Sequence, residues 1–172
     1  VCIACHGPDG NSNSATPLWP KIAGQHENYI VQQIKAFKAG TRQDPNMAPM
    51  VAPLTDQEIA DMAAYFTSQT KQIGKASSEE LATAGQKVYR GGNKKTGLPA
   101  CSGCHGLMGT GNPAANYPTI NGQQVDYTKK QLTDYQSGAR GKDGKGFIMQ
   151  EIAAKMSPAE VQAVAEYITG LH

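Results

Sequence analysis

The four cysteines of this 172-residue chain form two Cys-x-x-Cys pairs, and a histidine directly follows each pair. The pentapeptides are CIACH at residues 2–6 and CSGCH at residues 101–105. In a helical turn, side chains three positions apart share a face, so both sulfurs can reach one edge of a flat ligand while the next residue places its imidazole over it. The pattern is typical of covalent c-type haem attachment. We therefore expect two haem c groups, held by Cys2, Cys5, His6, Cys101, Cys104 and His105.

Three other uses of paired cysteines fit this spacing poorly. A disulfide framework gives no reason for the histidine after each pair. A zinc site made from two pairs needs about 15–20 residues between them, whereas 95 residues separate Cys5 from Cys101. A thioredoxin-like centre needs a neighbouring strand–helix–strand pattern, and neither motif has one. The sequence thus favours haem over a disulfide, a zinc ion or a thiol redox centre.

The chain repeats itself about 100 residues further on, which indicates two related domains in tandem. PKIAGQ at residues 20–25 corresponds to PTINGQ at residues 118–123, and an apolar pattern of helical period follows each. Each half closes with a helix that starts at a capping box, Thr55 to Glu58 and Ser157 to Glu160. The predicted fold class is all-α. We expect domain 1 at residues 1–70, a polar linker at 71–77 and domain 2 at 78–172.

One difference separates the two halves. A predicted helix that starts near Ser78 precedes the second motif, whereas the first motif begins at Cys2. We therefore expect that the equivalent N-terminal helix of domain 1 is missing from this sequence.

The composition is short of material for two separate cores. Only 39% of the residues are hydrophobic, and domains of this size often rely on a cofactor. A haem in each half completes its core, with Ile22, Ile34, Ile120 and Leu132 as candidate packing residues. No apolar run approaches the roughly 20 residues of a membrane helix. The 16 basic and 14 acidic residues give no field that indicates nucleic-acid binding.

Methionine fits the second axial position of each iron better than the remaining histidines do. His26 has no histidine counterpart in the repeat and His172 ends the chain, so we interpret both as surface residues. Met47 and Met149 each stand eight residues before a capping residue. The repeat therefore selects Met47 and Met149 as iron ligands together with the two motif histidines, and Met50, three residues from Met47, stays an alternative.

A histidine and a methionine together fill both axial positions. A thioether is a soft, neutral ligand that favours ferrous iron. No coordination position is then left for a substrate. We therefore predict an electron carrier with no catalytic residues, not an enzyme.

These motifs resemble class I cytochromes c, and their tandem arrangement resembles the dihaem cytochrome c4 family. The resemblance rests on C-x-x-C-H-G-x-x-G-N, P-K-x-A-G-Q-H, a loop methionine and a capped last helix that ends in AAYF or AEYI, and it covers nearly the whole chain. It implies two tandem class I domains, each wrapped around one covalently attached haem. It also implies that Gly85 and Tyr89 pack against the last helix. In each domain it adds a proline whose carbonyl meets the proximal histidine and an isoleucine that packs on the haem, here Pro20, Ile22, Pro118 and Ile120.

The resemblance also implies a place in the cell. It indicates a periplasmic carrier in a respiratory chain, which takes electrons from a respiratory complex, passes them toward a terminal oxidase and associates peripherally with the membrane. The alternative is an electron-accepting dihaem subunit of a larger oxidoreductase, such as a sulfide-oxidising flavocytochrome. Neither function involves nucleic acid or a transmembrane segment.

Overall fold

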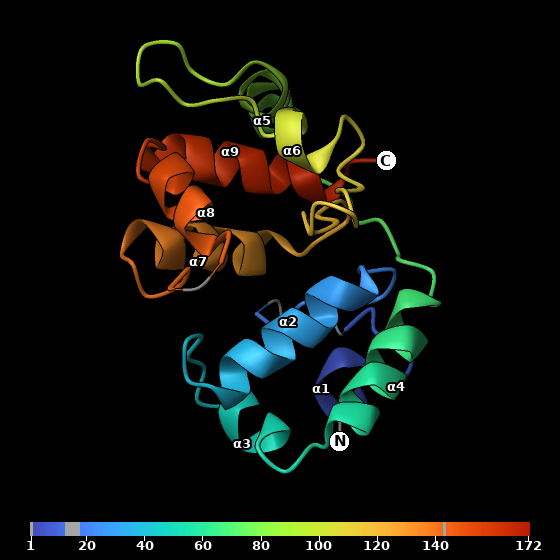
Figure 1. Cartoon of the computed structure of the whole chain (residues 1–172). Helices are drawn as coiled ribbons and strands as arrows, with labels where there is room; N and C mark the ends of the chain where they lie inside the picture. Colours follow the sequence, from blue (N-terminus) through green and yellow to red (C-terminus); the bar gives the residue numbers. More distant parts are fainter. Residues whose placement is uncertain (1, 13–17, 143) are drawn as a thin grey trace.

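The chain folds into helices and loops throughout the residues that the computed structural model describes, 2–12, 18–142 and 144–172 (Figure 1). Within these ranges, β-type pairing is limited to two isolated bridges, Asn93–Leu98 and Asn112–Tyr117. The N-terminal helices are α1 (Ile3–His6), α2 (Glu27–Lys38), α3 (Met47–Val51) and α4 (Asp56–Thr67). The C-terminal helices are α5 (Glu79–Gly91), α6 (Ser102–His105), α7 (Val125–Gln136), α8 (Gly146–Ala153) and α9 (Pro158–Thr169). The predicted all-α fold is confirmed.

Helices α4 and α9 begin at the predicted capping boxes. The hydroxyl group of Thr55 accepts the backbone N–H of Glu58 at 3.3 Å, and the Glu58 carboxylate accepts the backbone N–H of Thr55 at 2.8 Å. Ser157 and Glu160 make the same two bonds at 3.3 and 2.8 Å. Both bonds satisfy N–H groups that the first turn of a helix leaves unpaired.

Two short helices, α3 and α8, occupy segments that we expected to be loops. The carboxylate of Asp44 starts α3, because it accepts the backbone N–H groups of Asn46 and Met47 at 2.9 and 3.0 Å. This helix has only five residues and contains Pro49, so its period is too short to be recognised in the sequence. Each of the two helices carries one of the methionines chosen as iron ligands.

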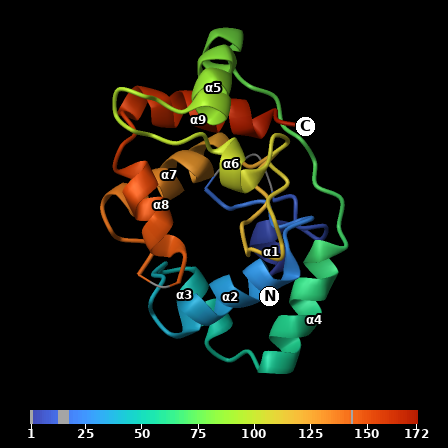
Figure 2. The same ribbon diagram turned by 45° about the horizontal axis from the view of Figure 1, so that its top comes forward.

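The two halves differ in the size of their apolar clusters. In the C-terminal half, α5 crosses α9 (Figure 2), and the contact is close enough that a Cβ on Gly85 would lie 2.0 Å from the carbonyl oxygen of Ala163. Tyr89 on α5 is completely buried. The expected packing of Gly85 and Tyr89 against the last helix is thus present. The described N-terminal half has no helix equivalent to α5, and its buried cluster comprises only Ile30, Ala63 and Phe66.

Helices α2 and α7 face each other where the two halves meet (Figure 1). The segment between α4 and α5 runs along one side of this boundary and is held at several points. The backbone N–H of Gly74 donates to the Thr169 carbonyl at 2.9 Å, and the buried carboxylate of Glu166 accepts both the N–H and the hydroxyl of Ser77 at 2.8 Å. None of the described helices is long and apolar enough to cross a membrane.

Candidate haem sites

The first motif forms α1, a single turn of helix. The backbone N–H of His6 donates to the Cys2 carbonyl at 2.9 Å, so Cys2 and Cys5 lie on the same side of the turn. Gly7 ends the turn with φ of 77°, a conformation that glycine adopts without steric cost. His6 is buried, with only 7% of the residue exposed, whereas Cys2 and Cys5 are half-buried.

The second motif repeats this geometry in α6. The N–H of His105 donates to the Cys101 carbonyl at 3.0 Å, and Gly106 ends the turn with φ of 78°. His105 is 9% exposed. The hydroxyl group of Tyr89 donates to the Gly106 carbonyl at 2.7 Å, which anchors the end of the motif to α5. The structure therefore brings both cysteines and the histidine of each motif together.

Each motif histidine has one defined partner, as the resemblance implied. His6 Nδ1 lies 2.9 Å from the Pro20 carbonyl oxygen, and His105 Nδ1 lies 3.0 Å from that of Pro118. Burial lowers the pKa of both imidazoles, although the bonds to the proline carbonyls act in the opposite direction. The rings are therefore neutral at pH 7, and because a carbonyl only accepts, Nδ1 carries the proton. Nε2 is then the unprotonated nitrogen in each ring, as a metal ligand must be.

Ile22 and Ile120 stand beside the motifs. Their backbone N–H groups donate to the carbonyls of Gly10 and Gly109, each at 2.7 Å. Ile22 packs against the N-terminal apolar cluster together with Cys2, and Ile120 packs against the C-terminal cluster together with Cys101. Each isoleucine therefore packs against the same apolar cluster as the first cysteine of a motif, and its packing on a haem stays a prediction.

The methionines differ in burial. Met47 and Met149 are half-buried on α3 and α8, and Met62 on α4 is half-buried as well, whereas Met50 is 47% exposed. Met156 is buried in the C-terminal apolar cluster, where its side chain packs against other core residues. The choice of Met47 and Met149 as second iron ligands stays a prediction.

The residues present fit haem c. Each half offers two thiols that form no disulfide on one side of a turn, a buried neutral imidazole with an unprotonated Nε2, and a half-buried thioether. Within the described parts of the chain, no cluster of three or more histidine, cysteine or acidic residues is arranged to bind a bare metal ion. The donor set thus suits an iron that is largely coordinated by a macrocycle, with two axial ligands from the protein.

Comparison with known proteins establishes the family. The model of the cytochrome c family matches residues 1–70 and again residues 82–172. Cytochrome c4 of Azotobacter vinelandii is 48% identical over 181 residues, covering 100% of this chain and 85% of that protein. The crystal structure of reduced recombinant cytochrome c4 from Pseudomonas stutzeri superposes with a TM-score of 0.94 at 45% identity, covering 99% of this chain and 93% of that one. The chain belongs to the cytochrome c4 family.

Membership in the cytochrome c4 family confirms three predictions. The chain consists of two tandem cytochrome c domains, it binds two covalent haem c groups, and it is an electron carrier rather than an enzyme. A more distant relative, named thiosulfate dehydrogenase electron acceptor in Thiomonas intermedia (strain K12), is 34% identical over 172 residues, covering 97% of this chain and 76% of that protein.

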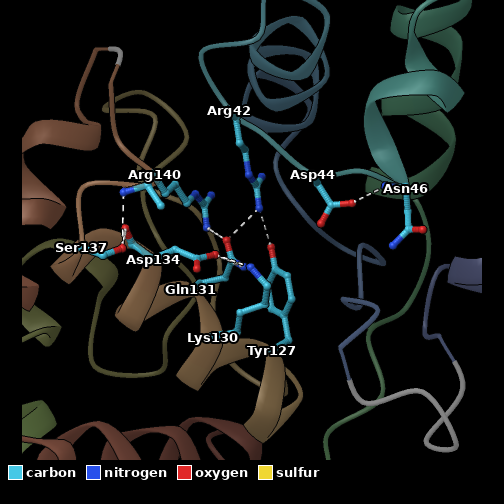
Figure 3. Close-up of polar contacts among 10 residues, drawn as sticks. Arg42, Asp44, Asn46, Tyr127, Lys130, Gln131, Asp134, Ser137 and Arg140 are labelled. Atoms are coloured by element: carbon cyan, nitrogen blue, oxygen red, sulfur yellow. Dashed lines mark hydrogen bonds and ion pairs between the residues drawn. The ribbon is translucent and has the colours of Figure 1, made fainter.

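The sequence did not predict the polar contacts that join the two domains. Figure 3 shows Arg42 reaching from the first domain to α7, where its Nη2 donates to the hydroxyl of Tyr127 at 3.0 Å and to Oε1 of Gln131 at 2.9 Å. Burial raises the pKa of Tyr127, but the guanidinium groups of Arg42 and Arg140 outweigh it and lower this pKa overall. The only sequence signal for this network was the recurrence of the same arginine, glutamine and tyrosine positions in both halves.

His26 also belongs to the boundary between the domains. We interpreted it as a solvated surface residue. It is half-buried, and its Nε2 makes an exposed contact with the second domain, 2.9 Å from the Thr110 carbonyl. The repeat gave His26 no role as an iron ligand, and a partner 84 positions away has no signal in the local sequence.

Proposed function

We propose that this member of the cytochrome c4 family carries electrons in the bacterial periplasm, taking them from a respiratory complex and passing them toward a terminal oxidase. In this role it associates peripherally with the membrane. Its partners are other redox proteins.

The proposed binding sites follow the repeat. Cys2 and Cys5 attach the first haem, with His6 and Met47 as axial ligands; Cys101 and Cys104 attach the second, with His105 and Met149. Pro20 and Pro118 orient the histidines, and Ile22 and Ile120 pack on the rings. The proposed domains are residues 1–70 and 78–172, joined by residues 71–77.

The observation that carries the proposal is the complete donor set in each half. The proline carbonyl holds the imidazole in one tautomer, which increases its basicity as a ligand. Two axial ligands leave no position for a substrate, and the buried, hydrogen-bonded histidines change their geometry little between oxidation states. Bound haem c supplies a one-electron couple between ferric and ferrous iron.

The test uses the purified protein with both haems attached. Reduced protein is mixed in a stopped-flow instrument with membranes that contain a cytochrome oxidase, and reoxidation of both haems is followed in air. We expect that cyanide abolishes the reoxidation. We also expect that carbon monoxide, added to the purified reduced protein without membranes, causes no spectral change. Carbon monoxide binding to either haem, or reoxidation at the same rate with cyanide, would overturn the carrier function.

A second candidate is an electron acceptor for an enzyme that oxidises inorganic sulfur compounds. It is favoured by the similarity to the thiosulfate dehydrogenase electron acceptor of Thiomonas intermedia, and it is close to the alternative that the sequence left open. The oxidised protein is mixed with thiosulfate dehydrogenase and thiosulfate, or with a sulfide-oxidising flavoprotein and sulfide. Reduction at catalytic amounts of either enzyme would favour this candidate, and reduction no faster than with substrate alone would exclude it.

A further inference from the structure

Two buried glutamines, Gln25 and Gln123, each bind the backbone of one residue in the opposite domain. Gln25 Nε2 donates to the Thr119 carbonyl at 2.8 Å, and Gln25 Oε1 accepts the Thr119 N–H at 3.1 Å. Gln123 makes the matching pair with Lys21, donating to its carbonyl at 2.8 Å and accepting its N–H at 2.9 Å. Each side-chain amide thus forms two hydrogen bonds with a single residue across the boundary.

The residues held in this way directly follow the prolines that orient the motif histidines. The N–H of Lys21 belongs to the same peptide group as the Pro20 carbonyl, which lies 2.9 Å from His6 Nδ1. The N–H of Thr119 and the Pro118 carbonyl share a peptide group in the same way. Because a peptide group is planar, a bond that fixes its N–H also fixes the direction of its C=O. A donor bound by the peptide carbonyl and an acceptor bound by its N–H also polarise one another.

The glutamines are themselves held firmly in their own domains. Gln25 Oε1 also accepts the N–H of His26, and Gln123 Oε1 accepts that of Gln124, both at 2.9 Å. The preceding glycines, Gly24 and Gly122, have φ of 61° and 69° and donate their N–H groups at 2.9 Å to carbonyls at the ends of α4 and α9. The position of each amide is therefore set by the domain that contributes it.

We propose that Gln25 and Gln123 are reciprocal positioning residues, each holding from its own domain the peptide that orients the proximal histidine of the other domain. The inference rests on the proposed role of His6 and His105 as iron ligands. A weaker bond from imidazole Nδ1 makes the ring a poorer electron donor, which favours ferrous iron and raises the potential. Each domain thus contributes to the reduction potential of the haem in its partner domain.

The test replaces each glutamine in the protein with both haems attached. Gln25→Met and Gln123→Met keep the length and bulk of the side chain but remove both hydrogen bonds. The readouts are the midpoint of each haem in a spectroelectrochemical titration and the hyperfine-shifted Nδ1–H proton of each ligand histidine in the ferric protein. The haems are distinguished by the contacts of their thioether protons with Ile3 or Ser102.

We expect a crossed pattern. Gln25→Met raises the midpoint of the haem in the second domain and shifts the His105 signal, and Gln123→Met does the same for the first haem and His6. At the wild-type midpoint potential, the ratio of reduced to oxidised haem should change by up to about tenfold. This is the lower end of the effect that removing a hydrogen-bond partner of a metal ligand has on metal affinity or activity. Asn28→Ala is the control, because Asn28 Nδ2 donates across the same boundary to the Pro113 carbonyl at 2.7 Å without touching either proximal peptide.

Other results would overturn the inference. A change in the haem of the same domain, an equal change in both haems, or the same effect from Asn28→Ala would mean that the glutamines only hold the domains together. If Gln25→Met cannot be obtained with two haems, Gln25→Asn, which withdraws the amide by one methylene, replaces it. Absence of the His6 and His105 signals from the wild-type spectrum would refute the ligand assignment instead, so the two failures are distinguishable.

Discussion

Arg140 Nη2 donates to the hydroxyl group of Tyr29 across the domain boundary at 2.7 Å. The same guanidinium donates to Gln33 of the first domain at 3.0 Å and to Gln131 at 2.6 Å. Arg140 is only 7% exposed, and no carboxylate among the described residues forms an ion pair with it. The pKa of Arg140 is raised because interactions with Tyr29 and the other tyrosines outweigh the opposing effect of burial, so the guanidinium stays charged.

We expect Arg140→Met to lower the free energy of unfolding by about 3 kcal/mol, because the part-buried Tyr29 hydroxyl loses this donor and Gln33 and Gln131 keep only their bonds from Arg42. Thermal and denaturant unfolding of the protein with both haems attached measures the change. Lys142→Met, at a neighbouring exposed position, is the control and should change stability by less than about 0.5 kcal/mol. Equal effects of the two variants would contradict the structural role of Arg140.

The contact between α5 and α9 predicts the effect of a single methyl group. A Cβ on Gly85 would lie 2.0 Å from the Ala163 carbonyl oxygen and 2.7 Å from the Cβ of Tyr167, so the helices must separate to admit it. We expect Gly85→Ala to cost about 3 kcal/mol, measured as the loss of thermal stability of the second domain.

Gly91, in the last turn of the same helix, is the matched control. A Cβ there meets no atom within 4 Å. Gly91→Ala should therefore be neutral or stabilising by up to about 1 kcal/mol, because alanine favours the helix. If both variants are equally stable, the close approach of α5 and α9 at Gly85 is wrong.

Sequence alone predicted the features that depend on short-range chemistry. Thr55 and Ser157 cap their helices because a hydroxyl and a glutamate three residues later can satisfy the first N–H groups without any other part of the fold. The repeat alignment also worked, since the same local pattern folds in the same way twice. Together they were sufficient for the fold class and the two attachment motifs.

The remaining features depend on partners that are distant in the sequence. Gln25 meets Thr119, 94 positions away, and Arg42 meets Gln131, 89 positions away, so neither contact leaves a periodic or local pattern. The contact of His26 with Thr110 left no local pattern for the same reason. Helices α3 and α8 were missed because five or eight residues give too few turns to establish a helical period.

Glu160 should make the stability of the second domain depend on acid pH. Its carboxylate accepts bonds from the backbone N–H and the hydroxyl of Ser157 and from Asn93 Nδ2, each at 2.8 Å. The backbone bond to Ser157 is the largest cause that holds the pKa of Glu160 below its usual value. A carboxyl whose pKa is lowered by folding contributes stability above its unfolded pKa, and this stability is lost as the pH falls through the folded pKa.

Glu160→Gln should therefore reduce stability at pH 7 by about 1 kcal/mol, the size of a capping interaction. The difference from the wild type should shrink once the pH falls below about 4.3, the ordinary pKa of glutamate, and further as it passes through the lowered folded pKa, because the wild-type carboxyl then becomes protonated too. Glu151→Gln, at an exposed position on α8, is the control. A difference that stays constant from pH 7 to pH 3 would show that the lost charge is not the cause.

The methionine assignment can be tested at two positions three residues apart. Met47 is half-buried at the start of α3, whereas Met50 is 47% exposed. The weak far-red band of ferric iron bound to methionine sulfur reports the ligand directly, and with one of two haems altered, Met47→Ala should remove about half of its intensity. Met50→Ala is the matched control and should leave the band intact.

Met149→Ala should remove the other half of the far-red band. Each variant that removes a true ligand should also bind carbon monoxide at one haem. Loss of the band in Met50→Ala with Met47→Ala unchanged would reverse the assignment in the first domain, and an intact band in Met149→Ala would refute the assignment in the second.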